Sequence, residues 1–471
     1  MKNVECEIGM IGLGVMGINL VLNFTDHGFS AAGFDKDKSK VAALNKAAEN
    51  RKAFGADSLS EFIKILKKPR KIMMLVPAGA PVDAVIDEVL PYLDPGDIII
   101  DGGNSHFVDT NKRFKEVGAK GIHFLGVGIS GGESGARFGP SMMPGGPKEA
   151  YEIVRPIFEA ASAKYNNEKC VTYLGPGSAG HYVKMVHNGI EYGLMQLISE
   201  SYDLMKRGLG LTNEQMHKVF SDWNNKELQS FLVEITADIF SKKDDDTGGS
   251  LIDKILDEAK QKGTGKWTSQ DAMEIQVPVP TIDAAVSMRD MSAYKTEREK
   301  AAEVLYGPDS KIEEEGQPFI QQLERALYFG IVITYAQGMA MLKRASDEYK
   351  YAISLQNVAK IWRGGCIIRA ALLEDIRSAF EKAPNLPNLI IDPLLSKQIL
   401  NKQEDVRAII KTAIECGIPV PGFSASIAYF DSYRSEWLPA NLVQAQRDYF
   451  GAHTYERIDE KGIFHTQWSH I

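Results

Sequence analysis

The sequence predicts an α/β domain followed by a large all-α domain and a short C-terminal tail. Up to about residue 178, short runs of β-branched residues alternate with helical stretches, a pattern typical of a parallel sheet with crossover helices. After the turn signal Gly175-Pro176-Gly177, long stretches of helical periodicity replace this alternation. We therefore expect the three parts at residues 1–178, 179–435 and 436–471.

The strands of the first part are expected where short β-branched and apolar runs occur, at residues 8–11, 31–34, 71–76, 97–101 and 122–125. The stretches between them show helical spacing. In one of these stretches Ser58 and Glu61 fit a capping box, and Phe62 begins the apolar face that follows. This alternation predicts a sheet covered by helices.

The second part is predicted to be helical because its apolar residues recur on one side of long segments. In residues 179–207 the recurring apolar residues are Met185, Ile190, Leu194, Leu197, Ile198 and Met205. Similar patterns fill residues 213–240, 317–349 and 358–382. The last segment, from residue 436, has one helix-like stretch and then a polar tail, which needs a surface to lie on.

The composition of the 471 residues is that of a folded globular protein, with 44% hydrophobic and 25% charged residues. Lys and Arg number 54 against 62 Asp and Glu, a net charge of −8, which argues against nucleic acid or an anionic membrane as the main partner. Four scattered cysteines indicate neither a disulfide framework nor a zinc site. The N-terminus lacks the pattern of a secretory signal, and no uncharged stretch is long enough to span a membrane, so we expect a soluble cytoplasmic protein.

A glycine-rich motif at residues 12–17 follows the first expected strand and opens a helix, as in a dinucleotide-binding fingerprint. The glycines allow a tight turn and close approach of a pyrophosphate, which the helix N-terminus attracts. The alternative is a turn with no ligand. In this context the motif predicts a Rossmann-type domain that binds a nucleotide through Gly12, Gly14, Val15, Met16 and Gly17.

The second expected strand ends at Asp35 and Lys36, 18 and 19 residues after Gly17. A carboxylate at this point accepts hydrogen bonds from the ribose diol of NAD and repels the 2′-phosphate of NADP. Lys36 could balance such a phosphate, or lie over the adenine with its ammonium group in water. The residues favour NAD over NADP as the cofactor, with NADP possible.

Two further loops suit a small anionic substrate. Asn104 follows the buried strand at 97–101, at the edge of the sheet where open α/β folds bind ligands, although a simple turn is the alternative. Residues Ser130, Gly131 and Gly132 offer a hydroxyl and backbone amides to a carboxylate. Residues 128–132 also match the spacing of a nucleophile elbow, but no apolar helix follows, so a binding loop is the better interpretation.

A polar stripe in residues 184–191 carries the strongest signal for catalysis. Lys184, His187, Asn188 and Glu191 fall at helical spacing on one face. Such a stripe is more often a solvated surface, and His187 with Glu191 lacks the third ligand that a metal site needs. In a cleft, however, burial would favour a neutral Lys184 as base and a protonated Glu191 as acid.

Several cations could hold a phosphate group, although each alone is more often a surface residue. Lys262 and Thr264 lie in a glycine-containing segment that resembles a phosphate cradle without being a Walker motif. Arg289 and, far down the chain, Arg447 and His453 could add positive charge.

Together these motifs resemble the 6-phosphogluconate dehydrogenase family of the β-hydroxyacid dehydrogenase superfamily, over nearly the whole chain. The resemblance rests on residues 12–17, 97–106, 130–135 with 139–146, 180–192, 262–268, 362–369 and 441–455. It implies oxidation of 6-phosphogluconate by a nicotinamide cofactor, loss of CO2 and release of ribulose 5-phosphate, as in the pentose phosphate pathway and gluconate utilization. It implies no metal.

The resemblance also assigns roles to single residues. Lys184 matches the general base and Glu191 the acid that protonates C1. The positions that match substrate contacts are Asn104, Ser130, Gly131, Gly132, His187, Asn188, Tyr192, Lys262, Thr264, Arg289, Arg447 and His453. Arg447 and His453 match contacts delivered by a second subunit, so a homodimer with a shared active site is implied.

The departures from the family lie in the cofactor half. Asp35-Lys36-Asp37 stands where most members have Asn-Arg-Thr, whose arginine grips the 2′-phosphate. Val76-Pro77-Ala78-Gly79 replaces Val-Lys-Ala-Gly, so a cation is lost beside the cofactor positions Val76 and Ala78. Gly14 stands where many members have Ala. These changes favour NAD.

Two competing functions remain open from the sequence. A non-decarboxylating β-hydroxyacid dehydrogenase would share Lys184 but need no proton donor at C1, so Glu191 argues against it. A catalytically silent nucleotide-binding protein would need neither residue of the pair.

Overall fold

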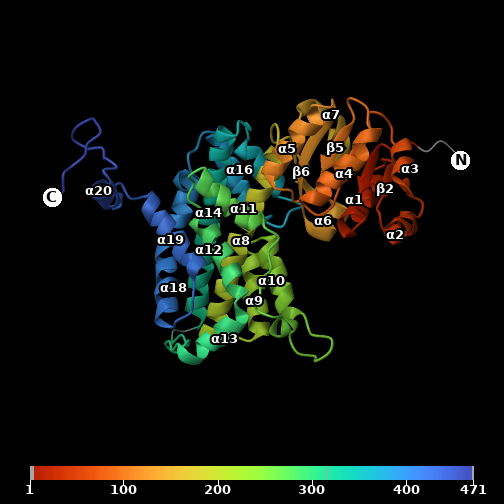
Figure 1. The fold of residues 1–471 in the computed structure, drawn as a ribbon. Coiled ribbons are helices and arrows are strands. Elements are labelled where there is room, and N and C mark those ends of the chain that lie inside the picture. The colour runs from red at the N-terminus through yellow and green to blue at the C-terminus, as the bar shows by residue number, and fades with distance from the viewer. Residues whose placement is uncertain (1–4, 314–315, 469–471) are drawn as a thin grey trace. The chain divides into compact units, whose positions relative to one another are not determined.

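The computed structural model describes residues 5–313 and 316–468 and divides into two compact units, Met1–Ser426 and Ile427–Ile471. Figure 1 shows a sheet with its helices early in the first unit and a helical bundle after it. The α/β part followed by a large helical part confirms the predicted fold class. The predicted boundaries at residues 178 and 435 stay a prediction.

The sheet has seven strands in the order β3-β2-β1-β4-β5-β6-β7. Its strands are β1 (Ile8–Ile11), β2 (Ala31–Phe34), β3 (Ala53–Gly55), β4 (Lys71–Met74), β5 (Ile98–Asp101), β6 (His123–Ser130) and β7 (Ser141–Gly145). The first six are parallel, and β7 pairs antiparallel with β6. The parallel order is that of a dinucleotide-binding Rossmann sheet, so ligands are expected beyond the carboxyl ends of the strands.

The five predicted strands are present in this sheet, and two of its strands, β3 and β7, were missed. β3 has only three residues, and β7 contains Pro144 between small and unbranched residues, which predict a loop. Pro144 is tolerated because β7 lies at the edge of the sheet.

Helices cover both faces of the sheet. They are α1 (Val15–Asp26), α2 (Lys38–Ala48), α3 (Leu59–Lys64), α4 (Ala80–Val89), α5 (Phe107–Gly118), α6 (Gly132–Phe138) and α7 (Lys148–Ala161). One apolar cluster joins the sheet to α1 and α7, through Leu20 and Phe158. A second cluster joins it to α3, α4 and α5, through Phe62, Val82 and Val117. Ser58 caps α3, because its side chain accepts a hydrogen bond from the backbone N–H of Glu61, but the predicted capping box is only half formed, since the carboxylate of Glu61 accepts from the backbone N–H of Asp57.

The helical part is built around α8 (Ala179–Asp203) and α14 (Gly316–Glu348), which pack together and are buried over most of their length. Around them lie α9 (Asn213–Asn224), α10 (Phe231–Ser241), α11 (Thr264–Glu274), α12 (Pro280–Ser292), α13 (Lys295–Val304), α15 (Leu355–Trp362), α16 (Leu372–Lys382), α17 (Pro393–Leu400), α18 (Gln403–Glu415) and α19 (Pro421–Tyr433). In the described part of the chain, no helix combines the length and apolar character needed to cross a bilayer. The expected cytoplasmic location stays a prediction.

Two of the predicted helical segments are interrupted. Residues 213–240 form α9 and α10 with a break between them, and residues 358–382 are broken by a loop after Trp362. In that loop Gly365 has φ +67°, a conformation that no helix interior contains. The loop matters for the site below.

The C-terminal unit contains α20 (Ala440–Gly451) and a short antiparallel contact between Tyr455 and Phe464. Asp448, fully buried, joins these pieces. Its carboxylate accepts hydrogen bonds from the backbone N–H groups of Thr454 and Thr466 and from Nε1 of Trp468, and it pairs with Nδ1 of His465. These hydrogen bonds and the pairing with His465 hold the pKa of Asp448 below its usual range.

Candidate active site

The first half of α8 lies directly against β6 and β7, and glycines make this possible. A Cβ atom on Gly128 of β6 would clash with the side chain of Lys184, and one on Gly180 of α8 would clash with the backbone of β6 and β7. Because no Cβ intervenes, the polar stripe of α8 lies beside the carboxyl end of β6, where Ser130 is located.

The polar stripe of α8 is buried. Lys184, His187 and Asn188 are 5%, 0% and 8% exposed, and Glu191 is partly buried. The alternative of a solvated helix face is therefore wrong for these residues. Charged and polar groups are buried at this density only where partners hold them, so the stripe is a candidate for function.

Four side chains form one hydrogen-bonded network. Nζ of Lys184 donates to Oδ1 of Asn188 at 2.6 Å, and Nδ1 of His187 lies 3.0 Å from the same oxygen. Because an amide oxygen only accepts, Nδ1 of His187 carries the hydrogen, and Nε2 accepts from Oγ of Ser130 at 3.2 Å. The network thus fixes the ring of His187 and aims Lys184 along the stripe.

Burial shifts the two proton-transfer candidates in opposite directions. It lowers the pKa of Lys184, although the charge of Glu191 opposes this. It raises the pKa of Glu191, against the influence of Lys184 and Arg289. Burial also lowers the pKa of His187 well below its usual value, so that ring stays neutral. The pair Lys184 and Glu191 is therefore suited to sharing a single proton.

The loop after α15 contributes contacts that sequence reasoning did not assign. The backbone N–H of Ile367 donates to Oγ of Ser130 at 3.3 Å. A Cβ atom on Gly131, whose φ is +127°, would lie 2.6 Å from the carbonyl oxygen of Gly365. The ring of Trp362 meets that of His187 edge-on, with centroids 5.5 Å apart. The signal for this loop was the glycine pair within residues 362–369.

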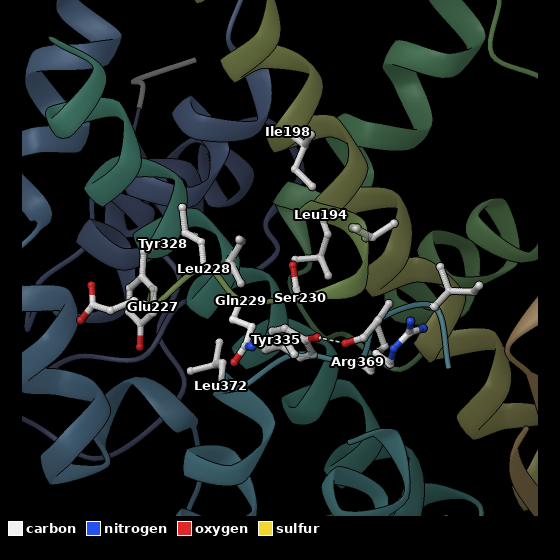
Figure 2. Close-up of a pocket in the computed structure, with 15 residues that line it drawn as sticks. Leu194, Ile198, Glu227, Leu228, Gln229, Ser230, Tyr328, Tyr335, Arg369 and Leu372 are labelled. Atoms are coloured by element: carbon white, nitrogen blue, oxygen red, sulfur yellow. Dashed lines mark hydrogen bonds between the residues drawn. The ribbon is translucent and has the colours of Figure 1, made fainter. Parts of the chain in front are cut away.

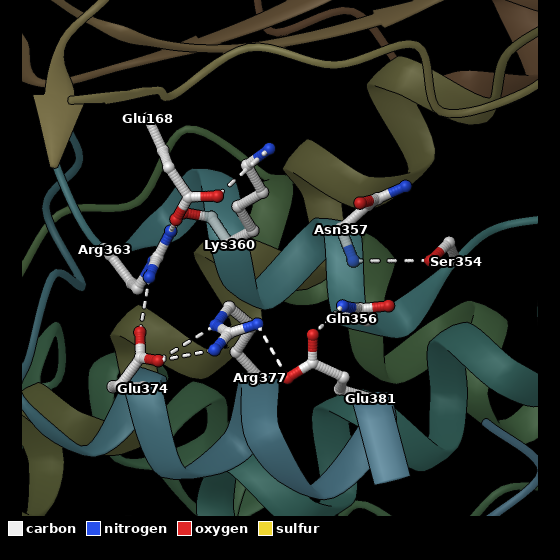
Figure 3. Close-up of polar contacts among 9 residues, drawn as sticks. All are labelled: Glu168, Ser354, Gln356, Asn357, Lys360, Arg363, Glu374, Arg377 and Glu381. Carbon is white, nitrogen blue, oxygen red and sulfur yellow. Dashed lines mark hydrogen bonds and ion pairs between the residues drawn. The ribbon is translucent and has the colours of Figure 1, made fainter. Parts of the chain in front are cut away.

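An ion-pair network anchors this loop, as Figure 3 shows. Arg363, 5% exposed, pairs with Glu168 on one side and Glu374 on the other. Glu374 also pairs with Arg377 on the same helix. Since these pairs join β9 (Glu168–Lys169), the loop and α16, they fix the backbone that contacts Ser130 and Gly131.

Cationic and hydroxyl groups gather near the far end of the stripe. The guanidinium carbon of Arg289 lies 3.3 Å from the ring centre of Tyr192, one residue beyond Glu191. The Oγ1 atom of Thr264 accepts from Nδ2 of Asn188 at 3.1 Å, while Lys262 lies exposed in the preceding loop. This arrangement suits an anionic group such as a phosphate.

Asn104 lies exposed just beyond β5, and Asp101 holds its loop. The carboxylate of Asp101 accepts from the backbone N–H of Gly103 at 3.0 Å and from Oγ of Ser105 at 2.6 Å. His181, one turn before Lys184, contacts the carbonyl oxygen of Asp101 at 3.1 Å. The Asn104 loop is thereby tied to the helix that carries the polar stripe.

The glycine motif fits the pyrophosphate of a dinucleotide. Gly12 has φ +96°, and a Cβ atom there or on Gly17 would clash with backbone oxygens. Gly14 faces open space and precedes α1, whose N-terminus has no side-chain cap. Val15 is exposed at the start of α1, while Met16 packs against the apolar core. Uncapped N–H groups and positive dipole at this glycine turn suit an anion.

A cavity of about 390 Å³ adjoins the glycine motif. Gly12, Gly14, Asp35, Lys36 and Val76 line it, whereas Ala78 lies exposed outside the lining. The carboxylate of Asp35 accepts from the backbone N–H of Leu13 at 2.8 Å. The cavity is therefore placed for the adenosine half of a dinucleotide.

Arg447 and His453 belong to the C-terminal unit, on and just after α20, and both are exposed. The guanidinium of Arg447 donates to Oε1 of Gln444 at 3.0 Å, and His453 contacts the ring of Phe450 edge-on.

A second cavity, drawn in Figure 2, holds none of the predicted site residues. It lies between α8, α14 and the loop after α15, has a volume of about 20 Å³, and has mostly aliphatic and aromatic walls such as Leu194 and Tyr335. This volume accommodates a water molecule and no substrate. Within residues 5–313 and 316–468, no group of three His, Cys, Asp or Glu side chains suits a metal ion.

Comparisons with known proteins agree over nearly the whole chain. Residues 7–175 match the family model described as the NAD binding domain of 6-phosphogluconate dehydrogenase, and residues 180–468 match the model of its C-terminal domain. The chain is 52% identical over 463 residues to the "6-phosphogluconate dehydrogenase, NADP(+)-dependent, decarboxylating" of Bacillus subtilis, covering 98% of this chain and 99% of the relative. It is 50% identical to the decarboxylating enzyme of Escherichia coli, with the same coverage.

The solved structure of Plasmodium falciparum 6-phosphogluconate dehydrogenase superimposes with a TM-score of 0.94 at 47% sequence identity, covering 98% of this chain and 100% of that one. That protein was solved in its apo form and with its cofactor NADP+ and its substrate 6-phosphogluconate. Two family models in the expected order, relatives at half identity and the same fold throughout leave one conclusion. The chain belongs to the 6-phosphogluconate dehydrogenase family.

Proposed function

We propose that this chain oxidises and decarboxylates 6-phosphogluconate, giving ribulose 5-phosphate, CO2 and a reduced nicotinamide cofactor. The observation that carries the proposal is the buried stripe of α8, where a lysine with a lowered pKa and a glutamate with a raised pKa share one helix face. The relatives and the solved neighbour named above support the substrate and the reaction.

In the oxidation step Lys184, in its neutral form, accepts the proton of the 3-hydroxyl group. Burial favours the neutral form, because it lowers the pKa of Lys184. Asn188 holds Nζ in place, since the amide oxygen accepts its hydrogen bond at 2.6 Å. The nicotinamide, when bound, supplies the acceptor for the hydride that leaves C3. The product is a 3-keto acid, and Lys184 carries the proton.

A 3-keto acid loses CO2 when a cation stabilises the negative charge that develops on the keto oxygen. The ammonium form of Lys184, produced in the first step, is that cation, so no metal is needed. Glu191, whose raised pKa favours the protonated form, then donates a proton to C1 of the enediol. The pair ends with the proton on Lys184 and the negative charge on Glu191, and one proton exchange between them resets it.

The remaining site residues bind and orient the sugar acid in this proposal. Ser130, Gly131 and Gly132 hold the carboxylate end together with His187, whose ring the network above keeps neutral and fixed. The groups near the far end of the stripe, Tyr192, Lys262, Thr264 and Arg289, hold the phosphate. Asn104 contacts both the substrate and the nicotinamide half of the cofactor.

We propose further that NAD is preferred over NADP. Asp35, at the end of β2, lines the cavity for the adenosine half, and its carboxylate would accept hydrogen bonds from a ribose diol and repel a 2′-phosphate. The Bacillus subtilis relative is named as NADP-dependent. The preference inferred for this chain therefore rests on its own residues Asp35-Lys36-Asp37 and Val76-Pro77-Ala78-Gly79.

A homodimer with shared active sites completes the proposal, with Arg447 and His453 of one subunit reaching the phosphate in the other. The C-terminal unit supports this, because its apolar side chains Leu442, Val443, Tyr449 and Phe450 are each at least 57% exposed. A surface of this kind suits burial against a second copy of the chain.

The reaction is tested by supplying the purified protein with 6-phosphogluconate and either nicotinamide and measuring both products. We expect one CO2 for each reduced cofactor, and faster reaction with NAD. Reduction without CO2 would indicate a non-decarboxylating dehydrogenase. Cofactor binding without any reduction would indicate a silent nucleotide-binding protein.

The shared site is tested by mixing two impaired variants, Lys184→Met and Arg447→Ala, under conditions in which subunits exchange, with 6-phosphogluconate kept well below the KM of the native protein so that each variant alone is nearly inactive. A mixed dimer has one site in which both residues are native, so activity should return. A mixture that stays as inactive as its components would show that the two residues serve the same subunit.

A further inference from the structure

We propose that Glu88 on α4 is a second determinant of cofactor preference, acting across the adenosine cavity from Asp35. It disfavours the 2′-phosphate of NADP in two ways. Its carboxylate pairs with the ammonium group of Lys36, which could otherwise bind the phosphate, and its own negative charge repels the phosphate. The inference rests on the proposed function, in which this cavity takes the adenosine half of the cofactor.

Glu88 belongs to the wall of the cavity. Pro81, Ala84, Val85 and Glu88 follow helical spacing on α4 and all line it, so one face of that helix forms a wall. Asp35 and Lys36, directly after β2, line the cavity as well. Among the described residues that line it, the carboxylates are those of Glu88 on α4 and Asp35 after β2.

Both lysines of the lining are paired with these two carboxylates. Nζ of Lys36 lies 2.5 Å from Oε1 of Glu88, and Nζ of Lys40 lies 3.6 Å from Oδ2 of Asp35. A 2′-phosphate that bound either lysine would therefore have to displace a carboxylate, and would still lie near it. A ribose diol meets no such obstacle, because its hydroxyl groups donate to carboxylates.

The sequence left open whether Lys36 balances a phosphate or lies over the adenine. The pair with Glu88 changes that question, since the ammonium group has a partner within the protein. The side chains of Lys36 and Glu88 are 69% and 42% exposed, so the ion pair is solvated and contributes little to folding. A substitution at Glu88 should therefore change nucleotide selection and leave the fold intact.

The test uses Glu88→Gln and two ligands that differ only in a 2′-phosphate, 5′-AMP and adenosine 2′,5′-bisphosphate, titrated calorimetrically at fixed ionic strength. We expect the bisphosphate to bind about three- to tenfold more tightly to Glu88→Gln than to the unchanged protein, as an exposed charge a few ångströms away would produce. Binding of 5′-AMP should change less than about twofold. The ratio of kcat/KM for NADP to that for NAD should rise in parallel.

Asp87→Asn is the matched control. Asp87 is the neighbouring residue on α4, but it lines a different cavity on the other side of the helix, with Lys112 and Arg113. The substitution changes the net charge equally, and we expect no change in the discrimination between the two ligands. An unchanged discrimination in Glu88→Gln, or an equal gain in Asp87→Asn, would overturn the inference.

The binding measurement needs no sugar acid, which separates this inference from the proposed function. If Glu88→Gln shifts the discrimination in a protein that does not turn over 6-phosphogluconate, the inference stands and the proposed reaction fails. If turnover proceeds and the discrimination does not shift, the reaction stands and the role of Glu88 fails.

Discussion

The polar groups of the catalytic helix and those of the adenosine cavity are held in different ways. On α8, Lys184, His187 and Asn188 are almost completely buried, and each is hydrogen-bonded to another member of the network. In the adenosine cavity, Lys36 and Glu88 form an ion pair whose side chains are 69% and 42% exposed. Removing one partner of a buried polar group costs stability, because the other partner is left without a hydrogen bond. Replacing a residue of a solvated ion pair changes stability very little.

This difference in burial indicates which of the two regions can tolerate substitutions. A change in the α8 stripe leaves other buried groups without partners and should abolish the chemistry. A change in the adenosine cavity should alter which cofactor is used and leave the chemistry intact. The positions at which the sequence predicts a departure from the family, Asp35-Lys36-Asp37, include two residues of the cavity lining, Asp35 and Lys36, and no residue of the stripe.

The largest expected effect is that of Lys184→Met, which removes the amine and keeps the volume. We expect nicotinamide reduction to slow by about 10³-fold or more, near the upper range for a general base. Nucleotide binding should be retained, because Lys184 lies on α8 and not in the adenosine cavity. Lys206→Met is the control, because Lys206 lies just after the end of the same helix and outside the stripe. Turnover within tenfold of normal would remove Lys184 from the mechanism.

The next effect is that of the double change Asp35→Asn and Lys36→Arg. It removes the carboxylate that repels a 2′-phosphate and supplies a planar, bidentate cation. We expect the ratio of kcat/KM for NADP over NAD to rise about 10- to 100-fold, as removal of a like charge implies. The rate of CO2 release at saturating cofactor should change little. A ratio that does not move would assign cofactor preference to other contacts.

A smaller effect is expected at Asp448, whose buried carboxylate accepts from four donors in the C-terminal unit. Asp448→Asn replaces an acceptor with an NH2 group among those donors, so the neighbouring Arg447 should be less well held. We expect KM for 6-phosphogluconate to rise about tenfold and kcat to change less, the split that lost binding produces. Asp459→Asn, at an exposed pair with Arg457, is the control. An unchanged KM would show that Asp448 contributes to folding and has no role in binding the substrate.

The same substitution should also change stability with pH. Because the folded pKa of Asp448 is lowered, its contribution to stability is present above the ordinary pKa of an aspartate and is lost as the pH falls towards the lowered value. When Tm is measured as a function of pH, it should therefore fall less steeply at acidic pH in Asp448→Asn than in the native protein.

The smallest effect on catalysis is expected at Glu200, a buried residue of α8 that lies outside the stripe. It accepts hydrogen bonds from the backbone N–H groups of Gly422 and Phe423 at the start of α19. Burial raises its pKa from 4.5 to about 7, so the folded state holds the proton more tightly and stability falls as the pH rises through that interval. In Glu200→Gln, the change in Tm between pH 5 and pH 8 should be smaller than in the native protein by about 2–4 °C, and kcat should be unchanged. An identical pH dependence would contradict the raised pKa.

The sequence alone predicted the fold class and most of the parallel strands, because buried β-branched runs and helical periodicity are local signals. It also predicted the stripe on α8, since the spacing of Lys184, His187, Asn188 and Glu191 fixes a common helix face. It did not predict β7, where Pro144 obscures an edge strand, or the loop after Trp362, whose apolar residues continue a helical pattern.

What the sequence could not provide is contact between distant segments. Ile367 and Ser130 are 237 residues apart, and only the folded chain brings the backbone of one to the hydroxyl of the other. The pairing of Lys36 with Glu88, 52 residues away, is of the same kind. Residue types and spacing therefore identify the catalytic helix and the residues Asp35 and Lys36 after the second strand, whereas the loop beside Ser130 and the pairing of Lys36 with Glu88 appear only in three dimensions.

The central claim is that an amine and a carboxyl group on one helix pass a single proton between them and the sugar, and the pH dependence of CO2 release tests it most directly. The native enzyme should give a bell-shaped profile, losing activity when this pair gains a second proton or gives up its last. Glu191→Gln should be slower and should keep only the acid limb, rising to a plateau. A full bell in Glu191→Gln would contradict the claim.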